Sequence, residues 1–217
     1  MGNKINATGF RVGVNKGWGS FWYAPKEQFA DLLLDDLKIK KFIRNKIEAS
    51  GVNLVKIKRS MNKVIIEVRV ARPGVVIGRG GAGIEELKKE LNRMIKGEVE
   101  LKVFEIKNPE IQARLIAENI KNQLVRRIVP KFAASREIEN AKKSPDVKGI
   151  KIWVGGRIKG AEIARVEKFQ WGSVPMQTLR AKIDYAFVDA QVPNAGKHGI
   201  KVWVYTGEKL DLDDTDF

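Results

Sequence analysis

Hydrophobic residues recur at helical spacing in three parts of this chain. Apolar positions three and four residues apart predict an amphipathic helix over about 26–49 and a second over about 82–96. A third apolar stripe begins at Pro109 and runs toward Pro130, which we expect to break or kink the helix. The helical pattern then continues to Ser144. Long helices are therefore predicted in both halves of the chain.

Between and after these helices, hydrophobic and polar residues alternate with a period of two. The segments VNLVKIKRS and KVIIEVRVA predict two strands joined by a turn at 60–62, and EVELKVFEIK predicts a third strand. Four more alternating runs predict strands at about 148–156, 163–171, 178–191 and 198–206. The first half is thus predicted to run helix, strand, strand, short helix, glycine loop, helix, strand. The second half is predicted to be helices followed by a sheet, which places the chain in the α+β class.

Changes in composition divide the chain into four regions. The first residues interleave glycines, aromatic side chains and cations with no acidic residue, which predicts an extended arm. The last residues, LDLDDTDF, are acidic and predict a solvated, disordered tail. The predicted regions are the arm at 1–24, a first domain at 25–108, a second domain at 109–207 and the acidic tail at 208–217.

The net charge of the chain indicates which class of molecule it binds. Lys and Arg number 41 against 26 Asp and Glu, so the net charge is +15, and the isoelectric point is about 9.9. An excess this large favours a polyanion as partner over an inert basic surface. The chain has no cysteine and one histidine, which excludes thiolate and histidine-based metal sites and paired-histidine catalysis. We expect that histidine, His198, to be a solvated turn residue.

Membrane and cofactor functions find no support in the sequence. No segment approaches the roughly 20 apolar residues that cross a bilayer, and the first residues lack the apolar core of a signal peptide. We therefore expect a soluble, cytosolic chain with no membrane partner. Because the charge excess suits a polymer of phosphates better than one dinucleotide, no cofactor and no small-molecule substrate are expected.

The stretch VVIGRGGAGIEELK, residues 75–88, fits two motifs at once. Its GRGGAG matches the dinucleotide-binding fingerprint, whereas its IGRGG matches the loop with which a KH domain clamps single-stranded nucleic acid. The dinucleotide motif should follow directly on a buried strand. Here the preceding strand ends near Ala71, and residues 72–74 separate it from the loop. Only residues 75–77 then remain before the loop, which is too few for a central strand but enough for one helical turn. The context therefore favours the KH loop over a nucleotide-dependent oxidoreductase.

The loop has the chemistry that a backbone clamp needs. Gly78 and Gly81 lack side chains, so a sugar-phosphate backbone can approach closely. Arg79 can fork onto a phosphate, and the helix that begins near residue 82 adds a partial positive charge.

The arm offers a second candidate for nucleic-acid contact. Its cations Lys4, Arg11 and Lys16 alternate with aromatic residues, notably Trp18 and Trp22. Such a mixture suits stacking on bases and pairing with phosphates. The alternative, equally open at this point, is that the two tryptophans dock the arm onto its own domain.

Long blocks of the chain resemble the bacterial-type family of small-subunit ribosomal protein three. The blocks are GNKINATGFRVGV, ARPGVVIGRGG, GGRIKGAEIARVEKFQWGSVPMQTLRAKIDYAFVDA and GIKVWVYTGE. The resemblance implies an N-terminal type II KH domain and a C-terminal α/β domain with a four-stranded mixed or antiparallel sheet. It also implies a non-enzymatic place in the head of the small subunit, with rRNA, mRNA at the entry channel, and ribosomal proteins ten and fourteen as partners. A free KH-type RNA regulator is the alternative.

Departures from the family pattern qualify this expectation. Gly80 stands where a basic residue is commoner, and Phe132 and Ser135 occupy positions that are often basic, with Pro130 interrupting the same region. The sequence therefore supports rRNA binding more than strong mRNA unwinding. The predicted RNA-binding residues are Lys4, Arg11, Lys16, Trp18, Trp22, Arg72, Gly78, Arg79, Gly80, Gly81, Lys88, Lys89, Arg126, Arg127, Lys131, Arg136, Arg157, Lys159, Arg165, Arg180 and Lys182.

Overall fold

The computed structural model describes residues 4–60, 63–95 and 97–208. The chain forms two compact units. The N-terminal unit is Trp18–Lys107, and the C-terminal unit runs from Asn108 onward and includes the residues up to Gly17. No helix among the described residues has the length and hydropathy to cross a membrane.

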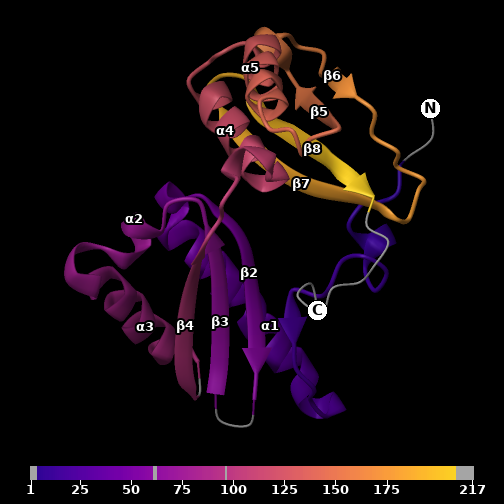
Figure 1. Ribbon diagram of the computed structural model, residues 1–217. Coiled ribbons are helices and arrows are strands. Elements are labelled where there is room, and N and C mark those ends of the chain that lie inside the picture. Colours follow the sequence, from indigo (N-terminus) through magenta and orange to yellow (C-terminus); the bar gives the residue numbers. More distant parts are fainter. Residues whose placement is uncertain (1–3, 61–62, 96, 209–217) are drawn as a thin grey trace. The chain divides into compact units, whose positions relative to one another are not determined.

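The N-terminal unit packs helices against a four-stranded sheet with the order β1-β2-β3-β4 (Figure 1). Its elements are β1 (Ser20–Phe21), α1 (Lys26–Lys46), β2 (Val52–Arg59), β3 (Lys63–Val70), α2 (Pro73–Ile77), α3 (Ala82–Met94) and β4 (Glu98–Glu105). β2 and β3 are antiparallel, and the outer pairs are parallel. The order α1-β2-β3-α2-α3-β4 confirms the expected KH arrangement.

The core of this unit follows from the register of its strands. Ile57 pairs with Ile66, so both side chains lie on one face of the sheet. Ile39 of α1 and Leu91 of α3 belong to the same buried cluster. The alternation seen in the sequence is thus the apolar face of the sheet, and the two amphipathic helices cover it.

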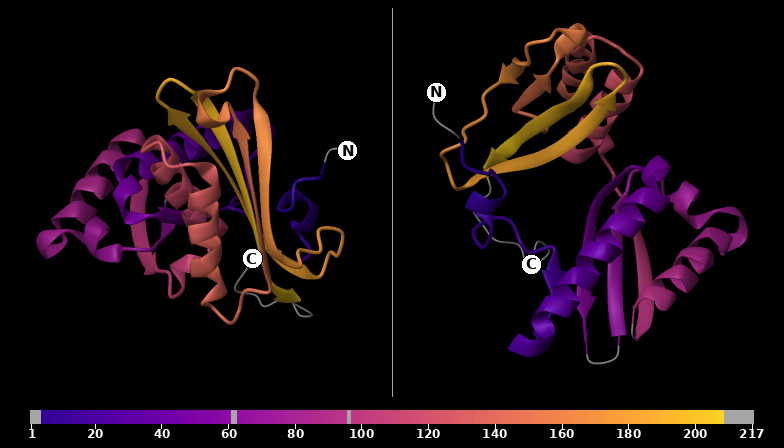
Figure 2. Two further views of the ribbon diagram at one scale, coloured as in Figure 1. Left: turned by 90° about the horizontal axis from the view of Figure 1, so that it is seen from above. Right: turned by 180° about the vertical axis from the view of Figure 1, so that it is seen from behind.

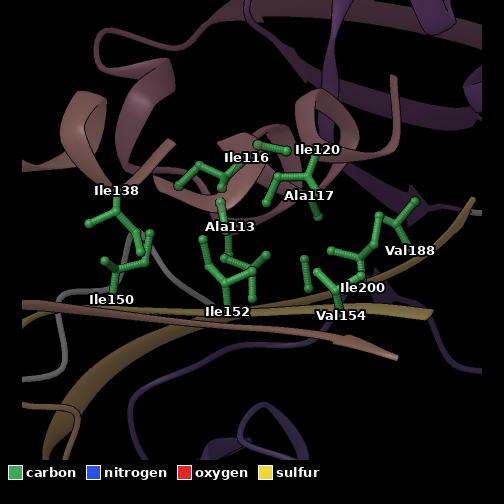
Figure 3. Close-up of a cluster of buried hydrophobic side chains, with 14 of the residues drawn as sticks. Ala113, Ile116, Ala117, Ile120, Ile138, Ile150, Ile152, Val154, Val188 and Ile200 are labelled. Carbon is green, nitrogen blue, oxygen red and sulfur yellow. The ribbon is translucent and has the colours of Figure 1, made fainter. Parts of the chain in front are cut away.

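The C-terminal unit places two helices on one face of a second sheet (Figure 2). Its elements are α4 (Ala113–Val125), α5 (Pro130–Lys142), β5 (Gly149–Gly156), β6 (Arg165–Gly172), β7 (Ala181–Val192) and β8 (Gly196–Glu208). The strand order is β6-β5-β8-β7, and every pair is antiparallel. Of the mixed and antiparallel sheets that the resemblance allowed, the structure has the antiparallel one. In Figure 3, Ile116 and Ile120 of α4 lie over Ile152 of β5 in the buried layer.

One helix end differs from the sequence prediction, and one break agrees with it. The first helix stops at Lys46 rather than 49, because a 3-10 turn over Glu48–Ser50 follows it. Pro130 breaks the helical pattern, as predicted, since α4 ends at Val125 and a new helix begins at Pro130. It opens α5 at the first helical position, where a missing N–H costs nothing because that N–H has no partner within the helix.

Candidate nucleic-acid interface

The glycine loop joins α2 to α3 by one 3-10 turn over Arg79–Gly81. Gly80 and Gly81 have φ values of +63° and +85°, a region that side chains disfavour. A Cβ atom added at either glycine would meet nothing within 4 Å. The main chain of this turn is therefore open to an approaching ligand, as a backbone clamp requires.

Gly83 has a different role from the loop glycines. A Cβ atom there would stand 2.5 Å from the carbonyl oxygen of Val76, which lies on the preceding short helix. The helix α3 begins at Ala82, where the sequence predicted its start. Gly83 is thus the residue that lets α2 and α3 approach closely and so holds the shape of the loop.

Four cations of the N-terminal unit lie in the loop or in the chain on either side of it. The side chains of Arg72, Arg79, Lys88 and Lys89 are exposed, and none of them forms an ion pair with a described residue. The acidic residues of α3 are partly neutralised, since Nζ of Lys46 lies 3.2 Å from Glu86 and 3.0 Å from Glu90. These two carboxylates raise the pKa of Lys46. The field around the loop is therefore positive on balance.

The first 24 residues do not form one extended arm. The part up to Gly17 packs in the C-terminal unit, while Trp18 and the residues after it belong to the N-terminal unit. Arg11 is fully buried, and its guanidinium donates hydrogen bonds to the carbonyl oxygens of Ala181, Thr178 and Met176. Because no part of its side chain is exposed, Arg11 is removed from the predicted RNA-binding surface.

The two tryptophans of this segment differ in environment. Nε1 of Trp22 donates to Asp36 at 2.9 Å, and its ring packs 5.1 Å from the ring of Phe29. The buried Asp36 also accepts two hydrogen bonds from Arg59. Trp22 thus docks onto its own unit, whereas Trp18 is 62% exposed and remains a candidate for stacking on a base.

The junction between α4 and α5 presents four exposed cations, Arg126, Arg127, Lys131 and Arg136. The α4 end is a Schellman turn, in which the N–H of Ile128 bonds to the carbonyl of Gln123. Arg127 occupies its left-handed position, with φ of +63°.

The remaining predicted cations of the C-terminal unit are mostly tied to protein partners. Lys16 pairs with Asp184 at 3.0 Å, Arg165 with Glu167 at 3.2 Å, and Arg180 with Glu208 at 2.7 Å. The pairs of Arg165 and Arg180 are at the surface and contribute about 0–1 kcal/mol, so a phosphate can compete for these two cations. The other members of the set are Arg157, which donates to the carbonyl of Ala161, and the exposed Lys159, Lys182 and Lys4.

His198 does not lie in a solvated turn. The hairpin turn closes at 193–195, and His198 follows in β8 with 3% of its surface exposed. A Cβ atom at Gly156 would stand 2.7 Å from its ring, so the imidazole packs against that glycine. The prediction failed because the sequence did not show where the turn ends and the strand begins.

A further group of cations and aromatic residues escaped the sequence analysis. On the face of the C-terminal sheet that α4 and α5 leave open, Lys151 and Lys201 lie beside Trp153 and Trp203. The signal was present, because both strands carry Lys-x-Trp, which places the two side chains of each strand on one face.

Comparison with known proteins agrees with this geometry. Residues 38–111 match the model of the KH domain, and residues 120–204 match that of the ribosomal protein S3 C-terminal domain. The small ribosomal subunit protein uS3 of Acetivibrio thermocellus is 47% identical over 210 residues, covering 97% of this chain and 92% of the relative. The uS3 proteins of Desulforamulus reducens and Clostridium botulinum are 44% and 46% identical, each covering 97% of this chain and 94% of the relative. With two domain models in the expected order and relatives this similar over almost its whole length, the chain belongs to the uS3 family of small ribosomal subunit proteins.

Proposed function

We propose that this chain is a structural constituent of the head of the small ribosomal subunit, where it binds rRNA and contributes to the mRNA entry channel. Membership of the uS3 family makes it a structural, non-enzymatic protein of the small subunit, and its KH domain implies rRNA binding there. The RNA contact at the loop is supported by one observation above all. The turn at Gly80 and Gly81 is open, and the exposed Arg79 lies beside it.

The contact with incoming mRNA is proposed for the junction between α4 and α5. Its four exposed cations can attract phosphates. Phe132 is 68% exposed at a position where the family resemblance favours a cation. We therefore propose that this surface holds mRNA with a modest unwinding effect. Ribosomal proteins ten and fourteen are the proposed protein neighbours, on the ground of the same resemblance.

The loop is tested by replacing Arg79 and Gly80 with Asp in the full chain. Asp tolerates the left-handed conformation of residue 80 better than most side chains, so the fold should be kept. We expect the affinity for small-subunit rRNA to fall by about tenfold or more, because two carboxylates repel the phosphates that the loop would hold. Lys41→Asp with Asn45→Asp, on the exposed face of α1, changes the charge by the same amount. Equal losses in the two variants would contradict a specific role of the loop.

Association with the ribosome is tested by sedimentation. The full chain should co-sediment with small subunits in high-salt sucrose gradients. A chain found only in the light fractions would instead support the free KH-type regulator.

A further inference from the structure

The open face of the C-terminal sheet holds a cavity of about 1050 Å³. Its lining includes four lysines, namely Lys4, Lys151, Lys168 and Lys201. The described residues that line it include no aspartate or glutamate. Four like charges around one hollow with no lining carboxylate make a site for an anion.

The register of three strands arranges cations and aromatic rings in alternation. Trp153 of β5 is opposite Lys168 on β6 and opposite Lys201 on β8. In the next row Lys151 is opposite Trp203, whose other neighbour is Tyr185 on β7. Directly opposed side chains on one face of a sheet lie within reach of one another. The lysine–tryptophan cavity, as we call the hollow lined by these residues and Lys4, thus combines charge with the partly exposed rings of Trp153 and Tyr185, whereas Trp203 is 4% exposed and packs against both rings.

Two glycines deepen the cavity next to the ring of Trp153. Gly155 and Gly199 are opposite each other in the adjacent row on the same face. Neither carries a side chain, so the floor of the sheet is bare at this point. A Cβ atom at Gly199 would lie 3.4 Å from the ring of Phe187, an ordinary contact, so packing does not require a glycine here.

The lysines of the cavity repel one another. The Nζ atoms of Lys151 and Lys168 each lie 4.9 Å from the centre of the Trp153 ring, and that of Lys4 lies 5.7 Å from it. Burial, followed by the neighbouring charges of Lys4 and Lys168, lowers the pKa of Lys151 to about 8. An anion among these ammonium groups would relieve that repulsion.

Trp153 also has an unused hydrogen-bond donor. Its Nε1 is buried and has no hydrogen-bond partner among the described residues. A buried donor without a partner is unfavourable, and this one belongs to a residue that lines the cavity.

We propose that the lysine–tryptophan cavity binds a nucleotide segment of single-stranded RNA, with its phosphates on the lysines and a base against the aromatic rings. The inference rests on the proposed RNA-binding function and adds a second site to it. Carboxylates alone, such as those of poly-aspartate, could neutralise the lysines, but they would leave the ring of Trp153 uncovered. RNA uses both features of the surface.

The first test uses the full chain and a fluorescently labelled short oligouridylate. Lys151→Gln with Lys168→Gln should weaken binding by about three- to tenfold and reduce the salt slope by about 1.4, since each lost phosphate contact on a single strand contributes about 0.7. The matched control is Lys142→Gln with Lys197→Gln. It removes the same charge from the same unit, and Lys142 likewise lies over a tryptophan ring, that of Trp171, outside the cavity.

A second variant keeps every charge and fills the hollow. Gly199→Val should weaken oligouridylate binding by about fivefold, because a base can no longer lie against the rings. RNA should also quench tryptophan fluorescence in the wild type, and Trp153→Phe should reduce that quenching. Circular dichroism confirms that each variant is folded.

The outcomes separate this site from the glycine loop. The inference is overturned if the cavity and control pairs lose affinity equally, if Gly199→Val binds as the wild type does, or if poly-aspartate at matched charge quenches Trp153 as strongly as RNA. If the wild type binds RNA and the cavity variants bind it with the same affinity, the proposed function stands and the second site is refuted. If the wild type binds no RNA, both proposals fail.

Discussion

Nε of Arg11 donates a hydrogen bond to the carbonyl oxygen of Ala181 across 2.8 Å. The two residues are 170 positions apart, and the contact fastens the beginning of the chain to the start of β7. The guanidinium of Arg11 is buried and is surrounded by main-chain carbonyls, which solvate its charge in place of water. An arginine that the sequence assigned to RNA is therefore a structural anchor.

Replacing this anchor should destabilise the C-terminal unit. Arg11→Met keeps most of the volume but leaves buried carbonyl oxygens without donors, and we expect a loss of about 2–4 kcal/mol in the free energy of unfolding. Urea unfolding followed by circular dichroism measures the change. Arg180→Met, which removes an exposed arginine paired with Glu208, should cost less than about 1 kcal/mol. Similar losses for the two variants would show that the buried hydrogen bonds contribute little.

Adding one methyl group at Gly83 should force α2 and α3 apart. Its Cβ atom would stand 2.5 Å from the carbonyl oxygen of Val76, so Gly83→Ala should lower the free energy of unfolding by about 1–3 kcal/mol. Gly74→Ala is the matched control, because a Cβ atom there meets nothing within 4 Å. Thermal unfolding compares the two. A Gly83→Ala protein as stable as the control would mean that the helices adjust at no cost.

Arg127 has a left-handed backbone conformation, which glycine adopts more easily than arginine. A change to glycine therefore has opposite expected effects on stability and on RNA binding. Arg127→Gly should leave the free energy of unfolding unchanged or raise it by about 0.5–1 kcal/mol, because glycine removes the backbone strain at the left-handed position of the Schellman turn. The same change should weaken RNA binding if the cation contacts phosphate. Arg126→Gly removes an equal charge from a residue without positive φ, and should destabilise the protein. A destabilising Arg127→Gly would contradict the conformational argument.

The lowered pKa of Lys151 predicts a dependence on pH. Its value of about 8 in the folded chain lies below the 10.5 of an ordinary lysine, so the unfolded chain binds more protons between these two values. The cost of charging Lys151 is therefore present below pH about 8, and stability should rise as the pH increases through this window. Urea unfolding on either side of the window should show the rise in the wild type, and the rise should be smaller in Lys151→Gln. Lys142→Gln should behave as the wild type does.

RNA binding should follow the opposite course. As Lys151 loses its proton above pH about 8, the affinity for oligouridylate should fall, because a neutral amine no longer attracts phosphate. Fluorescence anisotropy across the same window measures this change. An affinity that falls equally in Lys151→Gln would assign the effect to other lysines.

The local pattern of the sequence determined the order of elements in each unit and the position of the glycine loop. Helical and alternating periodicities depend on neighbours within a few residues, and so do the turn at 79–81 and the short helix before it. The resemblance, carried by long blocks of residues, determined the family. Even the Lys-x-Trp pairs of β5 and β8 were visible as alternation.

Tertiary structure alone decided which charged and aromatic side chains are available. Arg11 and Lys4 look alike in a basic segment, yet one is buried among main-chain carbonyls and the other is exposed at a cavity. Trp22 docks on Asp36, whereas Trp153 joins Lys201 from a strand far along the chain. Burial and cross-strand register depend on contacts between distant segments, which no local pattern specifies.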